Sequence, residues 1–383
     1  MKALIHSRLI LADREERDRA IVFDERIQGI TDNAAAVSMA DEVIDAGGAY
    51  VCPGLIDVHI HGWMGADVSD ADPDGIRRIC RGLVQNGVTS FLPTTMTISW
   101  DRLETIFRIL RDLKQESLQA DFEGSEILGC HAEGPFLNPE KKGAQLEECI
   151  IPADADKVLP YRDIIRLMTY APEMPGAMAF TKRIREESDI VLSIGHTSAS
   201  FQDAMAAVGL GVNHFTHTFN AMSPLKHRDP GAVGAALYSD GYAELIADTF
   251  HVNPPLFSIM AKVKGDRLCL ITDCLPAGGL PDGDYALGGE AFRLRGIECR
   301  LYDGTIAGSV LTMNRAVRNL RDYGGIPMWQ AVRAASLTPA ESICEEGRKG
   351  SLCAGKDADI VMMNDACEVI RTYVRGRLKY KAQ

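Results

Sequence analysis

The chain has 383 residues, and its 41 Lys and Arg against 53 Asp and Glu give a net charge of −12. That balance argues against a general nucleic-acid binder, which needs a basic face to replace phosphate counterions, although a local basic pocket for one small anion remains possible. No stretch approaches the ~20 continuous apolar residues of a membrane helix. We therefore expect neither a nucleic-acid partner nor a membrane partner.

The N-terminus and the cysteines favour a cytoplasmic protein. Residues 1–6 (MKALIH) lead into no long apolar region before a cleavage site, so no signal peptide is expected. The ten cysteines are scattered without a C-x-x-C spacing, which is typical of reduced, mostly buried thiols.

Both ends of the chain predict short β-strands, whereas the middle alternates between strand-like and helix-like segments. The strand-like runs at the ends cover residues 3–12, 19–23, 26–31, 359–363 and 369–374. No helical period runs through the first ~50 residues.

Between about Pro53 and Glu345, eight apolar runs predict parallel strands. They lie at residues 51–58, 88–93, 127–130, 166–170, 190–194, 211–215, 243–247 and 267–271. Helical segments separate most of them, among others at 73–85, 100–118 and 200–208. Eight strands joined by crossovers over ~290 residues predict an α/β fold with a (β/α)8, TIM-like barrel.

Histidines and acidic residues stand where these predicted strands end. His59 and His61 follow the first strand two residues apart, so they share one face and can bind one metal. The third, fifth, sixth and eighth strands end at Glu133, His196, His217 and Asp273. Because the carboxyl ends of barrel strands meet at one mouth, we expect all six to converge on a metal site.

Three further histidines are given no ligand role. His6 lies in the N-terminal strand region, and His214 is turned to the other side of its strand from His217 by the alternation of side chains. His131 shares a face with Glu133 and could lie behind the ligands without binding the metal.

These motifs resemble the metal-dependent amidohydrolase superfamily and, within it, the N-acetylglucosamine-6-phosphate deacetylases. The runs that carry the resemblance are 53–62 (PGLIDVHIHG), 131–136 (HAEGPF), 171–173 (APE), 195–197 (GHT), 216–224 (THTFNAMSP), 227–231 (HRDPG), 247–252 (ADTFHV), 272–273 (TD), 304–309 (GTIAGS) and 350–361 (GSLCAGKDADIV). They follow the family's order along nearly the whole chain, and residues 216–231 are specific to the deacetylase branch.

The resemblance implies a catalytic barrel at residues 53–345 and a small β-sandwich domain formed from residues 1–52 and 346–383. It implies hydrolysis of the acetamide of N-acetylglucosamine 6-phosphate to acetate and glucosamine 6-phosphate. Another phosphorylated N-acetyl amino sugar, or the substrate of a D-amino-acid deacylase, stays open. In this family a neighbouring subunit tends to complete the phosphate site, which implies a homodimer.

The resemblance also implies roles for the metal-site residues. Glu133, His196 and His217 match the main ligands of a divalent metal. Imidazole and carboxylate ligands suit zinc and iron, and we expect one of these two. Some family members replace the H-x-H pair and hold one metal. This chain keeps His59 and His61, so one or two ions per subunit are expected.

Catalytic and substrate-binding roles follow from the same match. Asp273 is expected to take a proton from water and deliver it to the departing amine. Arg228 and His251 are expected to hold the phosphate, since a guanidinium suits bidentate contact. The other expected substrate-binding residues are Ala144, Gln145, Asn220, Ala221, Ile306, Ala307 and Gly308. Some members carry His where this chain has Gln145, which could still donate to a substrate hydroxyl or carbonyl.

Two other interpretations fit less well. A dihydroorotase-like or hydantoinase-like enzyme uses a carboxylated Lys at the fourth strand end, and residues 170–173 (YAPE) hold no Lys. A non-enzymatic relative would typically have lost ligands, whereas each expected ligand is present.

Overall fold

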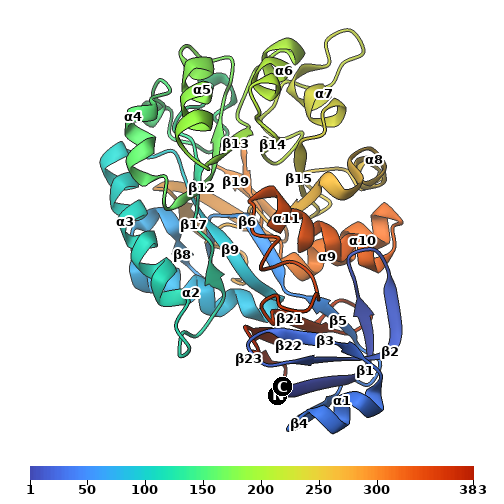
Figure 1. Cartoon of the computed structure of the whole chain (residues 1–383). Helices are drawn as coiled ribbons and strands as arrows, with labels where there is room; N and C mark the ends of the chain where they lie inside the picture. Colours follow the sequence, from blue (N-terminus) through green and yellow to red (C-terminus); the bar gives the residue numbers. More distant parts are fainter.

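The computed structural model, which describes residues 1–383, confirms the barrel of eight parallel strands (Figure 1). In barrel order they are β6 (Leu55–Ile60), β9 (Val88–Thr95), β11 (Cys130–Glu133), β12 (Ile165–Tyr170), β13 (Val191–Ile194), β14 (His214–Phe215), β15 (Tyr242–Ile246) and β16 (Leu268–Ile271). The ring closes where Asp273 N donates to His59 O and His61 N donates to Cys274 O, each at 2.9 Å. The short β10 (Glu126–Ile127) pairs with β9.

The first predicted strand, 51–58, is in fact two strands. β5 (Tyr50–Pro53) belongs to the terminal sheet and β6 to the barrel. Gly54 separates them, and a Cβ at this position would lie 2.1 Å from Thr89 Oγ1. The sequence does not show where the chain passes from one sheet to the other, because both strands are buried and together form one apolar run.

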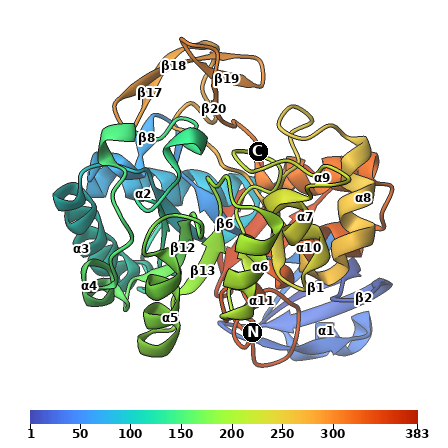
Figure 2. The same cartoon turned by 90° about the horizontal axis from the view of Figure 1, so that it is seen from above.

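Helices surround the barrel (Figure 2). They are α2 (Pro73–Leu83), α3 (Trp100–Ser117), α4 (Ala155–Val158), α5 (Ala177–Glu187), α6 (Phe201–Gly209), α7 (Gly231–Tyr238), α8 (Pro255–Lys264), α9 (Met313–Gly324), α10 (Met328–Ala334) and α11 (Leu337–Ser342). The three helices predicted at 73–85, 100–118 and 200–208 are confirmed as α2, α3 and α6. Capping fixes where two of them begin: Asp72 accepts from Asp74 N at 3.0 Å, and Ser200 and Asp203 form a capping box. None of the helices combines the length and the apolar character needed to cross a membrane.

The two ends of the chain form one mixed sheet, drawn at the bottom of Figure 1. Its strands are β1 (Lys2–Ile10), β2 (Glu15–Phe23), β3 (Ile27–Thr31), β4 (Glu42–Asp45), β5, β21 (Ile360–Met363), β22 (Val369–Val374) and β23 (Arg377–Lys381). β1 pairs with β4 along residues 2–5 and with β5 at residues 8–9. The sheet thus folds back around its own core, which includes Phe23 and Tyr373. The short helix α1 (Asn33–Met39) and the strands β4 and β23 were not predicted. The exact domain limits at residues 52/53 and 345/346 stay a prediction.

A buried ion cluster joins the terminal sheet to the barrel. The side chain of Lys349 is fully buried, and its Nζ donates to Glu126 Oε2 and Asp359 Oδ2 at 2.8 Å each. Glu126 lies on β10 and Asp359 directly precedes β21. The lysine therefore links the two parts of the fold at a point remote from the mouth of the barrel.

A second small sheet follows the last barrel strand. β17 (Gly283–Leu287), β18 (Glu290–Arg295), β19 (Glu298–Leu301) and β20 (Ile306–Gly308) are antiparallel, and Figure 2 shows them standing outside the ring of helices. Ser309 N donates to Asp273 O at 2.9 Å, which ties the end of β20 to the end of the barrel. A still smaller hairpin, β7 (Gly62–Trp63) and β8 (Ala66–Asp67), follows β6.

Candidate active site

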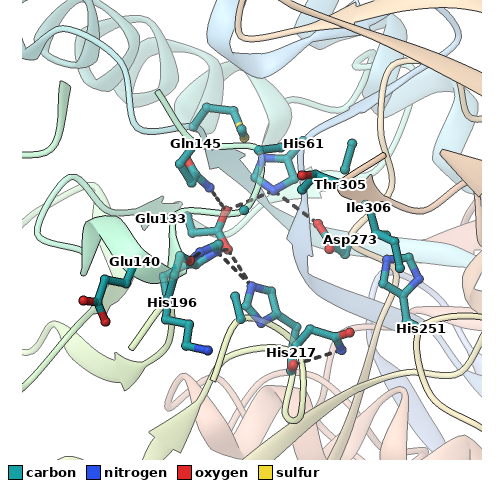
Figure 3. A pocket seen from close by; sticks show the side chains of 18 residues that line it. His61, Glu133, Glu140, Gln145, His196, His217, His251, Asp273, Thr305 and Ile306 are labelled. Atoms are coloured by element: carbon teal, nitrogen blue, oxygen red, sulfur yellow. Dashed lines mark hydrogen bonds and ion pairs between the residues drawn. The ribbon is translucent and has the colours of Figure 1, made fainter. Parts of the chain in front are cut away.

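A cavity of about 340 Å³ opens at the carboxyl ends of the barrel strands (Figure 3). Thirteen of the fifteen predicted site residues line it, namely His61, Glu133, Ala144, Gln145, His196, His217, Asn220, Ala221, His251, Asp273, Ile306, Ala307 and Gly308. The other two do not. His59 is fully buried beneath the cavity, and Arg228 is exposed outside it.

Glu133 stands at the centre of four imidazoles. Its Oε1 lies 3.2 Å from Nε2 of both His196 and His217 and 3.3 Å from Nε2 of His59. Its Oε2 lies 3.3 Å from Nε2 of His61. The Nε2 atoms of His196 and His217 are themselves only 3.1 Å apart. A neutral imidazole has one N–H, so this crowding of nitrogens and carboxylate oxygens is the arrangement of metal ligands.

The hydrogen bonds on the outer nitrogens support that reading. His196 Nδ1 donates to Lys141 O at 2.7 Å, and His59 Nδ1 donates to Glu244 Oε2 at 3.0 Å. The acceptors are a backbone carbonyl and a carboxylate oxygen, so a neutral imidazole at either position keeps its Nε2 lone pair for a metal. Two overlapping donor sets share Glu133, one with His196 and His217 and one with His59 and His61. These residues fit one or two divalent cations. A third group behind them joins His59 to Glu244 and to His131, whose two ring nitrogens are hydrogen-bonded to Val58 O and Thr169 Oγ1.

Several of these side chains are oriented by residues with a strained, left-handed backbone at the ends of the barrel strands. His196, His217 and Asp273 have φ of 48°, 29° and 51°, in the left-handed region that residues other than glycine rarely adopt. Such strain persists where the surrounding structure holds it, and it gathers at functional sites. Each residue stands at the end of a barrel strand, where the chain turns sharply away.

Asp273 faces the H-x-H pair. Its Oδ1 lies 3.3 Å from His61 Nε2 and 3.6 Å from His59 Nε2. Burial would raise the pKa of Asp273, but the hydrogen bond with His61 and the charge of His59 lower the pKa below its usual value. Burial likewise works against protonation of His61, yet hydrogen bonds with Asp273 and Glu133 raise its pKa to about 9. Asp273 is therefore an ionised carboxylate, able to accept a proton.

Gln145 makes a contact that differs from the expected one. Its Nε2 donates to Glu133 Oε2 at 2.6 Å, and its Oε1 accepts from Thr97 N at 2.5 Å. Both ends of the amide are thus engaged by protein groups. Gln145 borders the cavity, and this bond holds Glu133 in place. Its NH2 group has a second N–H, so a contact with a substrate oxygen stays a prediction.

His251 and Arg228 occupy different environments. Asp248 Oδ2 accepts from His251 Nδ1 at 2.6 Å, and Asp248 Oδ1 accepts from His251 N at 2.8 Å. These bonds leave His251 Nε2 available at the wall of the cavity, beside Asp273 in Figure 3. Arg228 lies on the exposed segment between β14 and α7 and does not reach the cavity of its own chain.

Comparison with known proteins identifies the barrel's family. A family model described as "Amidohydrolase family" matches residues 50–379, which is most of the chain. The chain belongs to the amidohydrolase family. It is accordingly a hydrolase of a metal-dependent family that acts on amide bonds, and its donor sets fit that dependence.

Two curated relatives of this amidohydrolase are deacetylases of phosphorylated sugars. An N-acetylglucosamine-6-phosphate deacetylase of Bacillus subtilis is 36% identical over 93% of this chain and 91% of its own length. An N-acetylgalactosamine-6-phosphate deacetylase of Escherichia coli O157:H7 is 35% identical over 90% of this chain and 92% of its own length.

A solved structure agrees with them. A mutant N-acetyl-D-glucosamine-6-phosphate deacetylase of Mycobacterium smegmatis, in complex with N-acetyl-D-glucosamine-6-phosphate, superposes with a TM-score of 0.90. It is 27% identical, and the match covers 99% of each chain.

Several residues of the amidohydrolase site were not foreseen. Met96, Glu140, Lys141, Gly143 and Thr305 also line the cavity. Thr305 lies in the run 304–309 quoted above, whereas the segments of the other four have no periodicity that indicates a site. Glu244 lies behind it, fully buried on β15. One signal could have found Glu244, since an acidic residue inside an apolar barrel strand must have a buried partner.

Proposed function

We propose that this amidohydrolase removes the acetyl group from N-acetylglucosamine 6-phosphate, yielding acetate and glucosamine 6-phosphate. One observation carries the proposal: a single cavity brings together a proton-accepting Asp273, the Glu133-centred ligand set and His251. The names of the relatives support the substrate. The relative that acts on N-acetylgalactosamine 6-phosphate makes that epimer the second candidate.

Metal binding and proton transfer are assigned to different residues of the cavity. Glu133, His196 and His217 would hold a divalent metal, which when bound lowers the pKa of a coordinated water to about 7 and polarises a carbonyl. Asp273 accepts the proton of the attacking water, whose oxygen joins the acetyl carbon. Asp273 then passes that proton to the sugar nitrogen as the C–N bond breaks, so that an amine leaves and not an amide anion.

The metal and the substrate contacts are parts of the same proposal. We propose zinc or iron as the metal, with His59 and His61 holding a second ion that shares Glu133. His251 would contact the phosphate through Nε2. Because its Nδ1 already donates to Asp248, Nε2 donates to the phosphate when the ring carries both protons. Asn220, Ala221 and the β20 residues Ile306, Ala307 and Gly308, together with Ala144, would enclose the sugar, because they form the cavity wall.

The substrate is tested by acetate release from three compounds, which are N-acetylglucosamine 6-phosphate, N-acetylgalactosamine 6-phosphate and unphosphorylated N-acetylglucosamine. We expect turnover of the first and a kcat/KM at least about 10²-fold lower for the third, since it forfeits charge-assisted hydrogen bonds of about 1.5–3 kcal/mol each. Faster turnover of the galactosamine compound would favour the second candidate. Equal turnover with and without the phosphate would contradict a phosphorylated substrate.

We also propose that Arg228 binds the phosphate in the cavity of a second subunit of a homodimer. Two observations support this arrangement: Arg228 is exposed and lies outside the cavity of its own chain. A cytoplasmic location stays a prediction, supported by ten free cysteines, most of them buried.

Mixed subunits test the dimer. Arg228→Ala and Asp273→Asn chains are each expected to be impaired, but in a mixed dimer one cavity has Asp273 and receives the partner's intact Arg228. After statistical exchange, about a quarter of wild-type activity should return. In the control, His251→Asn chains are mixed with Asp273→Asn chains. Because His251 lines the cavity of its own chain, neither cavity of that mixed dimer is complete, and no recovery of activity is expected. No recovery in the first mixture would contradict a shared site.

A further inference from the structure

Glu244 is a carboxylate buried behind the candidate metal site without a lysine or arginine partner. Its side chain is 0% exposed, and no lysine or arginine forms an ion pair with it. Its Oε2 accepts two hydrogen bonds, from His59 Nδ1 at 3.0 Å and from the backbone N of His217 at 2.9 Å. Its Oε1 has no hydrogen-bond partner.

The groups within reach of this carboxylate are imidazoles and one backbone amide. A buried carboxylate costs several kcal/mol unless an opposite charge lies near it. The nearest other imidazole belongs to His214, whose Nδ1 is 3.7 Å from Glu244 Oε1 and instead lies 3.1 Å from Ser193 Oγ. The His59 ring thus contacts Glu244 through Nδ1 on one side and Glu133 through Nε2, at 3.3 Å, on the other.

We propose that Glu244 is a positioning residue that serves both candidate metal positions through one oxygen atom. At the position with His59 and His61, it fixes the tautomer and orientation of His59, as carboxylates behind metal-bound histidines do. At the position with His196 and His217, it anchors the left-handed turn at His217 through the backbone N–H of that residue. The inference rests on the metal positions of the proposed function.

The two connections predict unequal effects. His59 contacts Glu244 through the ring that would bind the metal, so loss of the carboxylate alters both the basicity and the aim of Nε2. His217 contacts it only through the backbone, and its ring is set by the turn as a whole. Removal of the charge should therefore weaken the position with His59 and His61 more than the position with His196 and His217.

The test is metal binding to metal-free Glu244→Gln, titrated with Zn²⁺ and with Co²⁺, whose visible absorption reports the ligand geometry. The amide keeps the size and one acceptor oxygen but removes the charge. We expect two equivalents to bind the wild type, and the weaker equivalent to lose about 10–100-fold in affinity in the variant. Glu244→Asp, which keeps the charge one methylene further back, is expected to show a loss of the same order.

Glu126→Gln is the matched control, because Glu126 is also a buried acidic residue on a barrel-sheet strand but pairs with Lys349 far from the site. It should lower the unfolding temperature and leave metal binding unchanged. If Glu244→Gln behaves in the same way, or fails to fold, the carboxylate is only structural and the proposal is overturned. In a His59→Asn background, Glu244→Gln should cause no further loss at the position with His59 and His61, and only the smaller effect through the His217 backbone should remain.

These results separate the inference from the proposed function. Acetate release by the wild type together with unchanged metal affinity in Glu244→Gln would overturn the role of Glu244 alone. Loss of one equivalent in that variant, with no acetate released by the wild type, would leave the positioning role intact and remove the proposed substrate.

Discussion

Asp273→Asn is expected to lower kcat by about 10²–10⁴-fold, the usual contribution of a positioned acid–base group. The amide has the shape of the carboxylate, but it can neither accept the proton of the attacking water nor return it to the leaving nitrogen. The Glu133-centred ligands remain, so the variant should stay folded and should bind metal. Acetate release under saturating substrate, with metal content measured on the same sample, checks the result.

Asp303→Asn provides the comparison for that variant. Asp303 stands in the exposed turn before β20, close to the cavity but not in its wall, and accepts a hydrogen bond from Thr305 N. This control should keep near wild-type turnover. If Asp273→Asn with its metal in place stayed within about tenfold of the wild type, another group would have to move the proton.

Glu133→Gln is expected to abolish metal binding and activity together. Four imidazole nitrogens lie within 3.3 Å of the Glu133 carboxylate, so the amide NH2 group would replace an anionic oxygen that both donor sets share. We expect metal affinity to fall by more than the ~10–100-fold typical of a residue behind the ligands. Metal analysis after dialysis and acetate release are the measurements.

The expected loss of metal affinity in Glu133→Gln is large because Glu133 is negatively charged and the amide is not. Burial would raise the pKa of Glu133, but the charges of His59 and His196 and hydrogen bonds from His196 and His217 hold it well below the usual value. Glu140→Gln is the control, because Glu140 borders the same cavity but is exposed and touches none of the imidazoles. Full metal retention in Glu133→Gln would show that the ions bind elsewhere.

The barrel could be read from the sequence because its strands are buried on both faces. Such strands appear as continuous apolar runs, and seven of the eight barrel strands overlap such a run by two residues or more. The run 127–130 meets β11 (Cys130–Glu133) only at Cys130, because β11 continues into the polar site residues. The β17–β20 sheet was not predicted, because its strands are short and exposed polar residues interrupt their apolar positions. Helix α1, with seven residues, is too short to establish a helical period.

The strand-end residues of the site were predictable, whereas their partners were not. A position at the carboxyl end of a barrel strand follows from chain order, so Glu133 and Asp273 could be placed without coordinates. The bond from Gln145 to Glu133 depends on how a loop folds back, and the place of Arg228 depends on an exposed segment. Neither loop has a periodicity from which its path follows.

The pairing of the two chain ends sets the order in which this protein can be completed during synthesis. Val51 on β5, near the start of the chain, lies opposite Met362 on β21, near its end. All eight barrel strands therefore leave the ribosome before the terminal sheet can close. Until then β5 presents an open edge, and unpaired edges attract strands of other chains. Residues 360–381 are synthesised last, and the pairing of β21 with β5 then covers the edge at which the nascent chain could aggregate.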